Sequence, residues 1–392
     1  MRASTRGAII RAVIARVLTR RFAANYLSTL AIIGLSYWIV ADLSTFHRNV
    51  INAQWEFLRI HELMHVLIAV YVIVLIPYYA RHPWLRSKAF VFLQGSWFAI
   101  RRSRRAPSRA RLARQARDRM RLGFRASLSP AAKQAGLVLL LKFFFAPLMI
   151  NWCLGHVGDM YGSIVRVYDG WTAGQRGLSL FDSALFWACF QAILFVDTFL
   201  FTIGYLVEIP ALRNRIRSVD PTFFGWFICL ACYPPFNDFT GWFFQWQSTD
   251  FPQFDSLPGS ASQTTKDLIH VAANVTLLAL MVIYSSASVA LGFKASNLTN
   301  RGIVSRGPYA LVRHPAYAAK NLAWWIGGLP TLYLLAMAGN VRGLLYALLS
   351  LIGWSVIYAL RALTEERHLL FADNGYAEYQ ARVRWRFIPG VL

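Results

Sequence analysis

Long apolar runs recur along the whole chain and limit its fold more than any other feature of the sequence. A helix needs about 20 mostly apolar residues to cross the hydrocarbon core of a bilayer. Eight runs approach that length, at roughly 25–42, 60–80, 134–153, 181–206, 222–236, 267–291, 321–338 and 341–361. The fifth run is the shortest, and the sequence Cys232-Tyr-Pro-Pro interrupts its end. We therefore predict an all-α, polytopic membrane protein with about eight transmembrane helices.

The composition supports this class and excludes others. Hydrophobic residues make up 56% of the 392 residues and charged residues only 15%, against roughly 25% charged in soluble domains. This balance excludes disorder, a coiled coil and a secreted disulfide scaffold. All four cysteines lie in apolar runs (Cys153, Cys189, Cys229 and Cys232), and we interpret them as buried packing residues.

The positive charges predict the orientation in the membrane. Lys and Arg total 41 and Asp and Glu total 18, which gives a net charge of +23. Segment 101–125 holds eleven arginines, whereas 237–265 has three aspartates and no Lys or Arg. Because positive loops stay in the cytoplasm, we expect both termini inside and 237–265 outside. An Arg-rich, Lys-poor chain is typical of GC-rich bacterial genomes, so we expect a bacterial inner membrane.

The chain divides into two regions by its motifs. Residues 1–265 comprise a basic N-terminal arm, about five spans, the basic loop 101–133 and the outer loop 237–265. Within them, 108–124 reads as a basic amphipathic helix on the inner leaflet. No aromatic residue interleaves its arginines to stack a base, so nucleic acid is not an expected partner. The aromatic residues of the outer loop predict an interfacial belt.

One motif suggests zinc chemistry. His61-Glu62-Leu63-Met64-His65 matches the pattern H-E-x-x-H, in which two histidines on one helical face bind zinc and the glutamate acts as a base. An intramembrane zinc metalloprotease is therefore one alternative function. Because no third ligand is evident, we favour an interfacial polar patch and expect no metal.

Ionisable side chains also occur in or beside the predicted spans. They are Lys142 in the third span, Asp197 in the fourth, Glu208 just past it and His270 in the sixth. Charges at membrane depth are costly and usually face a partner or water. Lys142 and Asp197 lie near the inner ends of consecutive antiparallel helices, so a buried pair between them is one prediction.

Two groups of polar and aromatic residues near the C-terminus carry the main candidate chemistry. The first group reads Arg306-Gly307-Pro308-Tyr309 and Arg313-His314-Pro315-Ala316-Tyr317, and the second comprises Arg361, Glu365, Glu366, Tyr376, Tyr379, Arg382, Arg384, Arg386 and Pro389. Two spans that turn at Gly339-Asn340 join the groups, so both return to the cytoplasmic face. Gly and Pro favour a non-helical backbone with free amides and carbonyls. This mixture of acidic, basic and aromatic side chains suits a zwitterionic cofactor that carries adenosine. A loop that is merely exposed to solvent would account for the arginines but not for the other residues of the two groups.

Residues 291–392 resemble the isoprenylcysteine carboxyl methyltransferases, and related phospholipid N-methyltransferases and bacterial thiol methyltransferases. The resemblance rests on Gly-Pro-Tyr at 307–309, Arg-His-Pro-Ala-Tyr at 313–317, the Glu365-Glu366 pair and the tail. It implies S-adenosylmethionine at the cytoplasmic face and a lipophilic acceptor, a lipid or an isoprenoid-like molecule, that enters from the bilayer. The implied cofactor-binding residues are Gly307, Tyr309, His314, Pro315, Tyr317, Glu365, Glu366, Tyr379 and Arg382. The implied catalytic residues are Arg313, His314 and Glu366, of which the last two could act as a base for an amine or thiol acceptor.

This chain departs from the family pattern at two places. Ala318-Ala319-Lys320 stands where a Gly usually follows the His-Pro-x-Tyr motif, and Arg384 replaces a frequent proline. Residues 1–265 match no motif of this family and would shape an acceptor tunnel, so the identity of the acceptor stays open. Membrane sterol and steroid reductases, which bind NADPH, resemble the same loop and tail. NADPH-dependent reduction is thus the main alternative, and a non-catalytic lipid-binding scaffold is another.

Overall fold

The computed structural model describes residues 19–55, 58–82, 84–104, 128–372 and 375–391. These residues are almost entirely helical, and the only strands among them are two pairs of two-residue strands. Six helical segments are long and apolar enough to cross a membrane: Arg20–Leu43, Ile60–Arg81, Pro130–Thr172, Leu178–Leu206, Gln263–Lys294 and Val341–Ala372. The predicted class, an all-α polytopic membrane protein, is confirmed.

The predicted span at 222–236 is wrong. Two helices of eight residues each lie there instead, α10 (Phe223–Leu230) and α11 (Phe236–Phe243). Eight residues extend about 12 Å, far short of a hydrocarbon core of roughly 30 Å. Prolines 234 and 235 separate the two helices, because proline cannot donate the helical hydrogen bond and restricts the residue before it.

Helix α13 (Pro315–Met337) covers the predicted span at 321–338. Its 23 residues extend about 35 Å, enough to cross a bilayer by length. It is not among the six segments named above, and the polar residues Lys320 and Asn321 lie in its first turns.

The chain forms two compact units, which we describe separately. Residues 1–54 and 59–148 make the first unit, and residues 55–58 and 149–392 make the second. Helix α7 (Pro130–Thr172) supplies residues to both. The predicted division at residue 265 concerned function, and it stays a prediction.

The first unit packs α2 (Arg20–Trp38) against α4 (Ile60–Arg81) and α5 (Lys88–Arg104). Phe22, Leu75, Tyr79 and Ala80 form its buried cluster. A π-helical turn (Ile39–Leu43) and α3 (Thr45–Asn52) follow α2. The predicted amphipathic helix at 108–124 lies outside the described residues.

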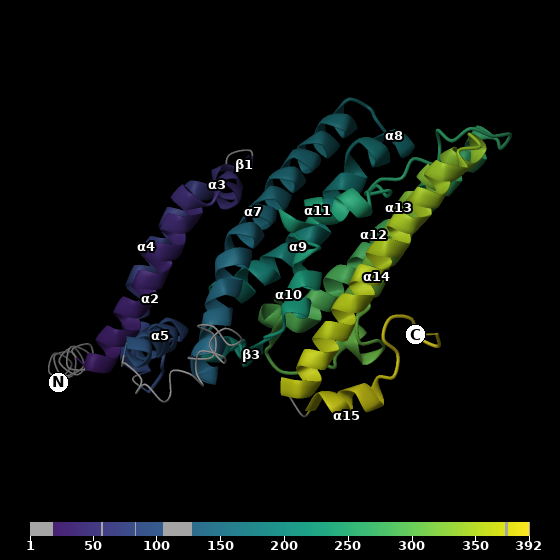
Figure 1. Cartoon of the computed structure of the whole chain (residues 1–392). Coiled ribbons are helices and arrows are strands. Elements are labelled where there is room, and N and C mark those ends of the chain that lie inside the picture. The colour runs from purple at the N-terminus through teal and green to yellow at the C-terminus, as the bar shows by residue number, and fades with distance from the viewer. Residues whose placement is uncertain (1–18, 56–57, 83, 105–127, 373–374, 392) are drawn as a thin grey trace. The chain divides into compact units, whose positions relative to one another are not determined.

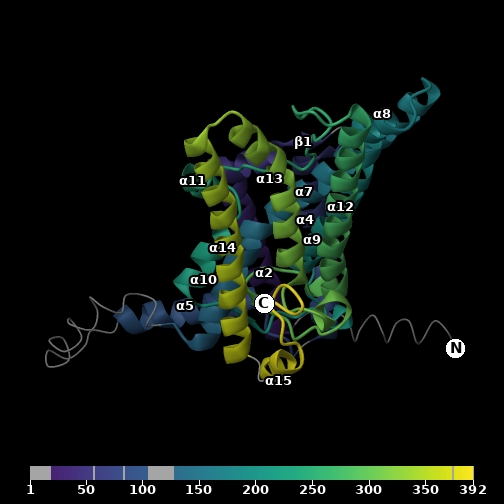
Figure 2. The ribbon, with the colours of Figure 1, turned by 90° about the vertical axis from the view of Figure 1, so that its right-hand side faces the viewer.

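The second unit is built on four long helices, α9 (Phe186–Leu206), α12 (Gln263–Leu291), α13 and α14 (Val341–Ala372). Helix α12 packs on both α9 and α13, and α13 packs on α14, so the four lie side by side (Figures 1 and 2). Short elements complete the unit: α8 (Leu178–Leu180), a π-helical turn (Phe181–Leu185), the 3₁₀ turns Pro210–Leu212, Gly292–Lys294 and Gly307–Ala310, the paired strands β3 (Ser218–Val219) and β4 (Thr299–Asn300), and α15 (Gly375–Arg382).

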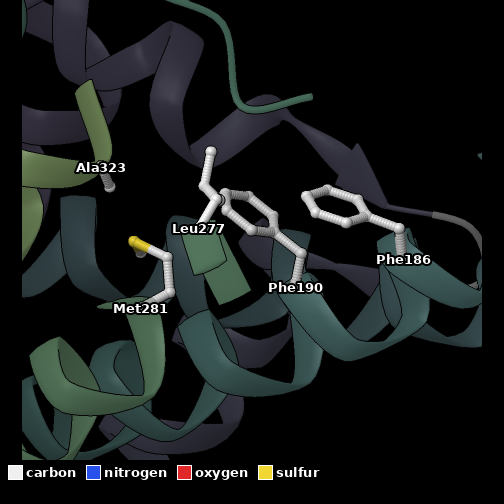
Figure 3. Packing of buried hydrophobic residues seen from close by; sticks show 5 residues of the cluster. All are labelled: Phe186, Phe190, Leu277, Met281 and Ala323. Atoms are coloured by element: carbon white, nitrogen blue, oxygen red, sulfur yellow. The ribbon is translucent and has the colours of Figure 1, made fainter. Parts of the chain in front are cut away.

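The core of this unit lies between α9, α12 and α13. Phe186 and Phe190 of α9 point toward Leu277 and Met281 of α12, with Ala323 of α13 at the other side (Figure 3). The two side chains on α9 and the two on α12 are each four residues apart and therefore share one face of their helix. The cluster fixes the three helices beside the cavity described below.

Segment 237–265 only partly fits the predicted aromatic belt. The Trp242 side chain is 76% exposed, as a belt residue would be. Trp246 instead packs edge-on against Trp324 of α13, and Phe251 packs on the Phe186 ring. The loop therefore folds back against the helices, which is why Gly327 of α13 faces its backbone with no room for a side chain.

Candidate functional site

The two C-terminal motif groups meet at one end of the second unit, as predicted. The backbone amides of Arg313 and His314 donate to the carbonyls of Trp385 and Arg386, each at 2.9 Å. The Tyr379 hydroxyl of α15 donates to the Tyr309 carbonyl at 2.8 Å. The tail is thus joined to the loop before α13 by both backbone and side-chain hydrogen bonds.

A buried ionic cluster reinforces this junction. The Glu366 carboxylate accepts from Arg313 Nε at 2.8 Å, from His314 Nε2 at 3.1 Å and from Arg386 Nη2 at 2.9 Å. Arg313 Nη1 also donates to the carbonyls of Val383 and Arg384. The Glu366 carboxylate raises the pKa of the Arg386 guanidinium, which lies in the tail. Glu366 of α14 therefore connects this helix to the loop before α13 and to the C-terminal tail.

A cavity lies beside this cluster, where α12 and α14 end and α13 begins. Its volume is about 200 Å³. Seven tyrosines line it: Tyr233, Tyr284, Tyr309, Tyr317, Tyr358, Tyr376 and Tyr379. Burial raises the pKa of Tyr309 and of Tyr376, and raises the pKa of Tyr379 to about 12. These three phenols outside the spans stay protonated near neutral pH. The hydroxyls of Tyr309 and Tyr376 can donate hydrogen bonds to a ligand, whereas that of Tyr379 already donates to the Tyr309 carbonyl.

Glu365 is the acidic group of α14 that faces the cavity. The Tyr317 hydroxyl donates to its carboxylate, and the Tyr317 ring stacks on the His314 ring with 5.5 Å between centroids. His314 Nδ1 and Arg361 Nη2 each lie 3.9 Å from a Glu365 oxygen. The carboxylate is 27% exposed, so it retains acceptor capacity toward the cavity.

Two buried guanidinium groups also line the cavity. Arg361 lies against the rings of Tyr233, Tyr317 and Tyr358, with its Nη2 donating to Asn297 Oδ1 at 2.9 Å. Arg301 donates to the carbonyls of residues 204 and 214. In both residues the Nε–H is buried and finds no hydrogen-bond acceptor among the described residues. Unpaired buried donors of this kind are uncommon and indicate a missing ligand or water.

The deep end of the cavity lies between α12 and α13. Lys320, three residues after Tyr317, lines it together with Tyr284 and Ser288. Asp197 of α9 lies behind these residues, and its carboxylate accepts from the hydroxyls of Tyr284, at 2.8 Å, and Ser288. The cavity therefore extends from the tail into the helix bundle.

The predicted site residues divide into two sets. Six line the cavity: Tyr309, Arg313, His314, Tyr317, Glu365 and Tyr379. The other four are not among its lining residues: Gly307, in a left-handed turn with φ of 60°; Pro315, at the start of α13; Glu366, in the ionic cluster; and Arg382, exposed at the end of α15. The assigned roles stay predictions.

Sequence reasoning missed several lining residues. Lys320, Tyr233, Tyr284, Tyr358 and Asn297 were not expected at the site, although all line the cavity. Helical spacing could have identified the first, since Lys320 follows Tyr317 by three residues on one face. The others come from α12, α14 and connecting segments, and no local pattern links them to the motifs.

The H-E-x-x-H residues form a different arrangement in the first unit. His61 Nε2 and His65 Nε2 both contact the Tyr37 hydroxyl, at 3.0 and 2.6 Å, and Glu62 pairs with Arg59. Within the described ranges, no group of three or more His, Cys, Asp or Glu side chains is placed to hold a metal ion. A tyrosine hydroxyl thus occupies the space between the two imidazoles.

The remaining ionisable residues have local partners. His270 is buried at the opposite end of α12, with Nε2 at 3.0 Å from Asp182 and Nδ1 at 3.4 Å from Asp255. Glu208 accepts from the backbone amide of residue 216. Lys142 belongs to the first unit and Asp197 to the second, so a pair between them stays a prediction.

Part of the second unit matches a known family model. Residues 255–383 match the model of a family described as a protein of unknown function, DUF1295. The matched segment is about a third of the chain and includes α13, α14, α15 and most of the cavity lining. No curated protein matches the chain.

Proposed function

We propose that this chain is an integral membrane methyltransferase that uses S-adenosylmethionine to methylate a lipophilic acceptor. The observation that carries the proposal is one cavity lined by a carboxylate, guanidinium side chains and tyrosine rings. Both motif groups and the tail contribute to it. A purely structural loop would not need to surround a cavity with these groups.

The residues present fit the cofactor by their donor and acceptor chemistry. The guanidinium groups of Arg301 and Arg361 would bind the cofactor carboxylate, and Glu365 would accept from its ammonium or ribose hydroxyls. The faces of Tyr309 and Tyr379 would hold its rings and its positive sulfur, because an aromatic face attracts cations.

When bound, S-adenosylmethionine supplies an activated methyl group on a sulfonium, so the protein itself needs no covalent chemistry. The chain's own residues would bind both molecules, align them and exclude water. Such alignment can lower a barrier by about 7–11 kcal/mol. The tail supports this role, since Tyr376 and Tyr379 line the cavity while the Glu366 cluster holds the tail in place.

We further propose that the cavity faces the cytoplasm of a bacterial cell, with both termini inside and the chain in the inner membrane. The arginines of 207–221 and of 301–313 gather at the cavity end of the second unit, whereas Asp182 and Asp255 lie at the other end. This asymmetry agrees with the positive-inside rule.

Calorimetric titration of the detergent-purified protein with S-adenosylhomocysteine and S-adenosylmethionine tests the proposal. We expect saturable binding of both that weakens at least tenfold in Glu365→Gln. The matched control Glu62→Gln, which removes an exposed carboxylate in the first unit, should bind like the wild type. Absence of binding by the wild type at millimolar ligand would refute the methyltransferase proposal.

NADPH-dependent reduction remains the second candidate, and the cation count favours it. Lys294, Arg301, Arg313, Lys320 and Arg361 line the cavity against two carboxylates, Asp220 and Glu365. Such an excess suits a ligand with several phosphates better than a zwitterion. The same titration with NADPH separates the candidates: reduction requires tight NADPH binding and no S-adenosylhomocysteine binding.

A further inference from the structure

The first unit contains an arrangement of side chains that the proposed methyl transfer does not use. His61 and His65 of α4 are four residues apart, so both side chains lie on one face of that helix. Tyr37 of α2 faces them, and its hydroxyl oxygen lies 3.0 Å from His61 Nε2 and 2.6 Å from His65 Nε2. The two imidazole rings stand edge to face, with 4.4 Å between their centroids. Three atoms that can bind a metal ion therefore meet at one place.

The packing of α2 against α4 brings these residues together. The Tyr26 hydroxyl of α2 donates to the Val72 carbonyl of α4 at 3.0 Å. Tyr37 lies 11 residues after Tyr26, and His61 lies 11 residues before Val72. In a pair of antiparallel helices, both steps advance about 16 Å in the same direction. The register of the two helices therefore places the Tyr37 hydroxyl opposite the first turns of α4.

The hydroxyl and the two imidazoles share protons in a way that a metal ion can replace. A phenol has one O–H, so it donates to one imidazole, and the other imidazole donates its own N–H to the phenol oxygen. A bound dication needs a lone pair from each of the three atoms. The N–H of the second imidazole would move from Nε2 to Nδ1, and the phenol proton would leave to water. Two neutral imidazoles and one phenolate would then hold the ion.

The distances require only a small expansion of this arrangement. Zinc lies about 2.0–2.2 Å from imidazole nitrogen and anionic oxygen in a tetrahedron, which puts its ligand atoms about 3.3 Å from one another. The present separations of 3.0 and 2.6 Å would lengthen by less than about 1 Å. His65 is exposed, and Tyr37 and His61 are half-buried, so an ion and a water molecule in the fourth position can reach the three atoms.

We propose that Tyr37, His61 and His65 bind one divalent transition metal ion, such as Zn²⁺, which links α2 to α4. Imidazole ligands favour transition metals, whereas Mg²⁺ and Ca²⁺ take oxygen ligands. In the described part of the chain, no third His, Cys, Asp or Glu joins the two histidines, and Tyr37 supplies the third ligand instead. Glu62 pairs with Arg59 at 3.2 Å on the exposed surface, so the ion joins two helices and has no role in peptide hydrolysis. This inference does not rest on the proposed function.

The charges of the first unit indicate the compartment that supplies the ion. Arg20 and Arg21 begin α2, and Arg81 ends α4, so these arginines lie at the end opposite the histidines. The positive-inside rule assigns the basic end to the cytoplasm. The ion would therefore enter from the outer side of the membrane.

Equilibrium titration with Zn²⁺ tests this inference. The full-length chain is purified without a polyhistidine tag, treated with EDTA and placed in nanodiscs. We expect one saturable equivalent of zinc, bound at least a hundredfold more weakly by His61→Ala and by His65→Ala. Affinity should fall at least tenfold in Tyr37→Phe, which keeps two of the three ligands. The matched control His82→Gln removes the histidine at the other end of α4 and should bind zinc like the wild type.

Hydrogen exchange of backbone amides shows whether the ion links the helices. Zinc should slow exchange at the end of α2 and the start of α4 in the wild type, and should not do so in His65→Ala. If the zinc-free His65→Ala variant exchanges faster than the wild type throughout α2, His65→Gln takes its place, since it keeps a polar partner for Tyr37. Absence of saturable binding at micromolar zinc would overturn the inference. Equal zinc affinity in the wild type and in either the Tyr37 or the His65 variant would do so too.

Discussion

Removing the Glu366 carboxylate should release the C-terminal tail. In Glu366→Ala, the Arg313 guanidinium would stay buried, since only 7% of its side chain is exposed, and would lose its carboxylate partner. Breaking a buried ion pair by removing one partner costs about 3–5 kcal/mol. Arg386 is 32% exposed, so solvent screening limits its own contribution to less than about 1 kcal/mol. The main loss therefore comes from Arg313.

Hydrogen exchange of the backbone amides in residues 375–391, followed by mass spectrometry, measures the effect. Because each 1.4 kcal/mol is about a factor of ten, the loss of 3–5 kcal/mol predicts exchange faster by roughly 100-fold to several thousand-fold. Glu378→Ala, an exposed change on α15, is the control and should exchange like the wild type. Tail exchange in Glu366→Ala within tenfold of wild type would refute this reasoning.

Two further predictions concern single contacts in the second unit. Tyr379→Phe removes the hydrogen bond to the Tyr309 carbonyl, so tail exchange should rise by the roughly fivefold that about 1 kcal/mol implies, and unchanged exchange would argue against this contact. Gly327→Ala would place a Cβ 2.2 Å from the Thr249 carbonyl oxygen, whereas Gly241→Ala meets nothing within 4 Å. Gly327→Ala should lower the melting temperature in detergent by the equivalent of about 1–3 kcal/mol, whereas Gly241→Ala should not. Equal melting temperatures of the two variants would show that segment 237–265 does not pack on α13.

The sequence allowed prediction of the long helices because their signal is local. Apolar runs of about 20 residues identify spans without knowledge of any partner. The run at 222–236 failed because apolar content was weighed above the two prolines that divide it. Hydrophobicity indicates burial but does not say whether a segment crosses the membrane. In the second unit, α10 is a short helix that packs on α14.

The site was only partly predictable for a related reason. The motif residues Tyr309, His314, Tyr317 and Glu365 could be expected to meet because two spans return them to one end of the bundle. Lys320 was noticed only as a departure from a family pattern, and its spatial neighbour Tyr284 lies 36 positions away on another helix. Contacts between distant helices depend on packing, which a single sequence does not encode in any local pattern.

The length of α7 has a consequence for the side of the membrane opposite the cavity. Its 43 residues form a rod of about 65 Å, roughly twice the thickness of the hydrocarbon layer. About half of this rod must stand in water or among lipid headgroups at any ordinary tilt. Its last turns carry Asp159, Arg166 and Asp169, which water solvates readily. The last turns of α7 would therefore project from the hydrocarbon layer into the headgroups or the water beyond it.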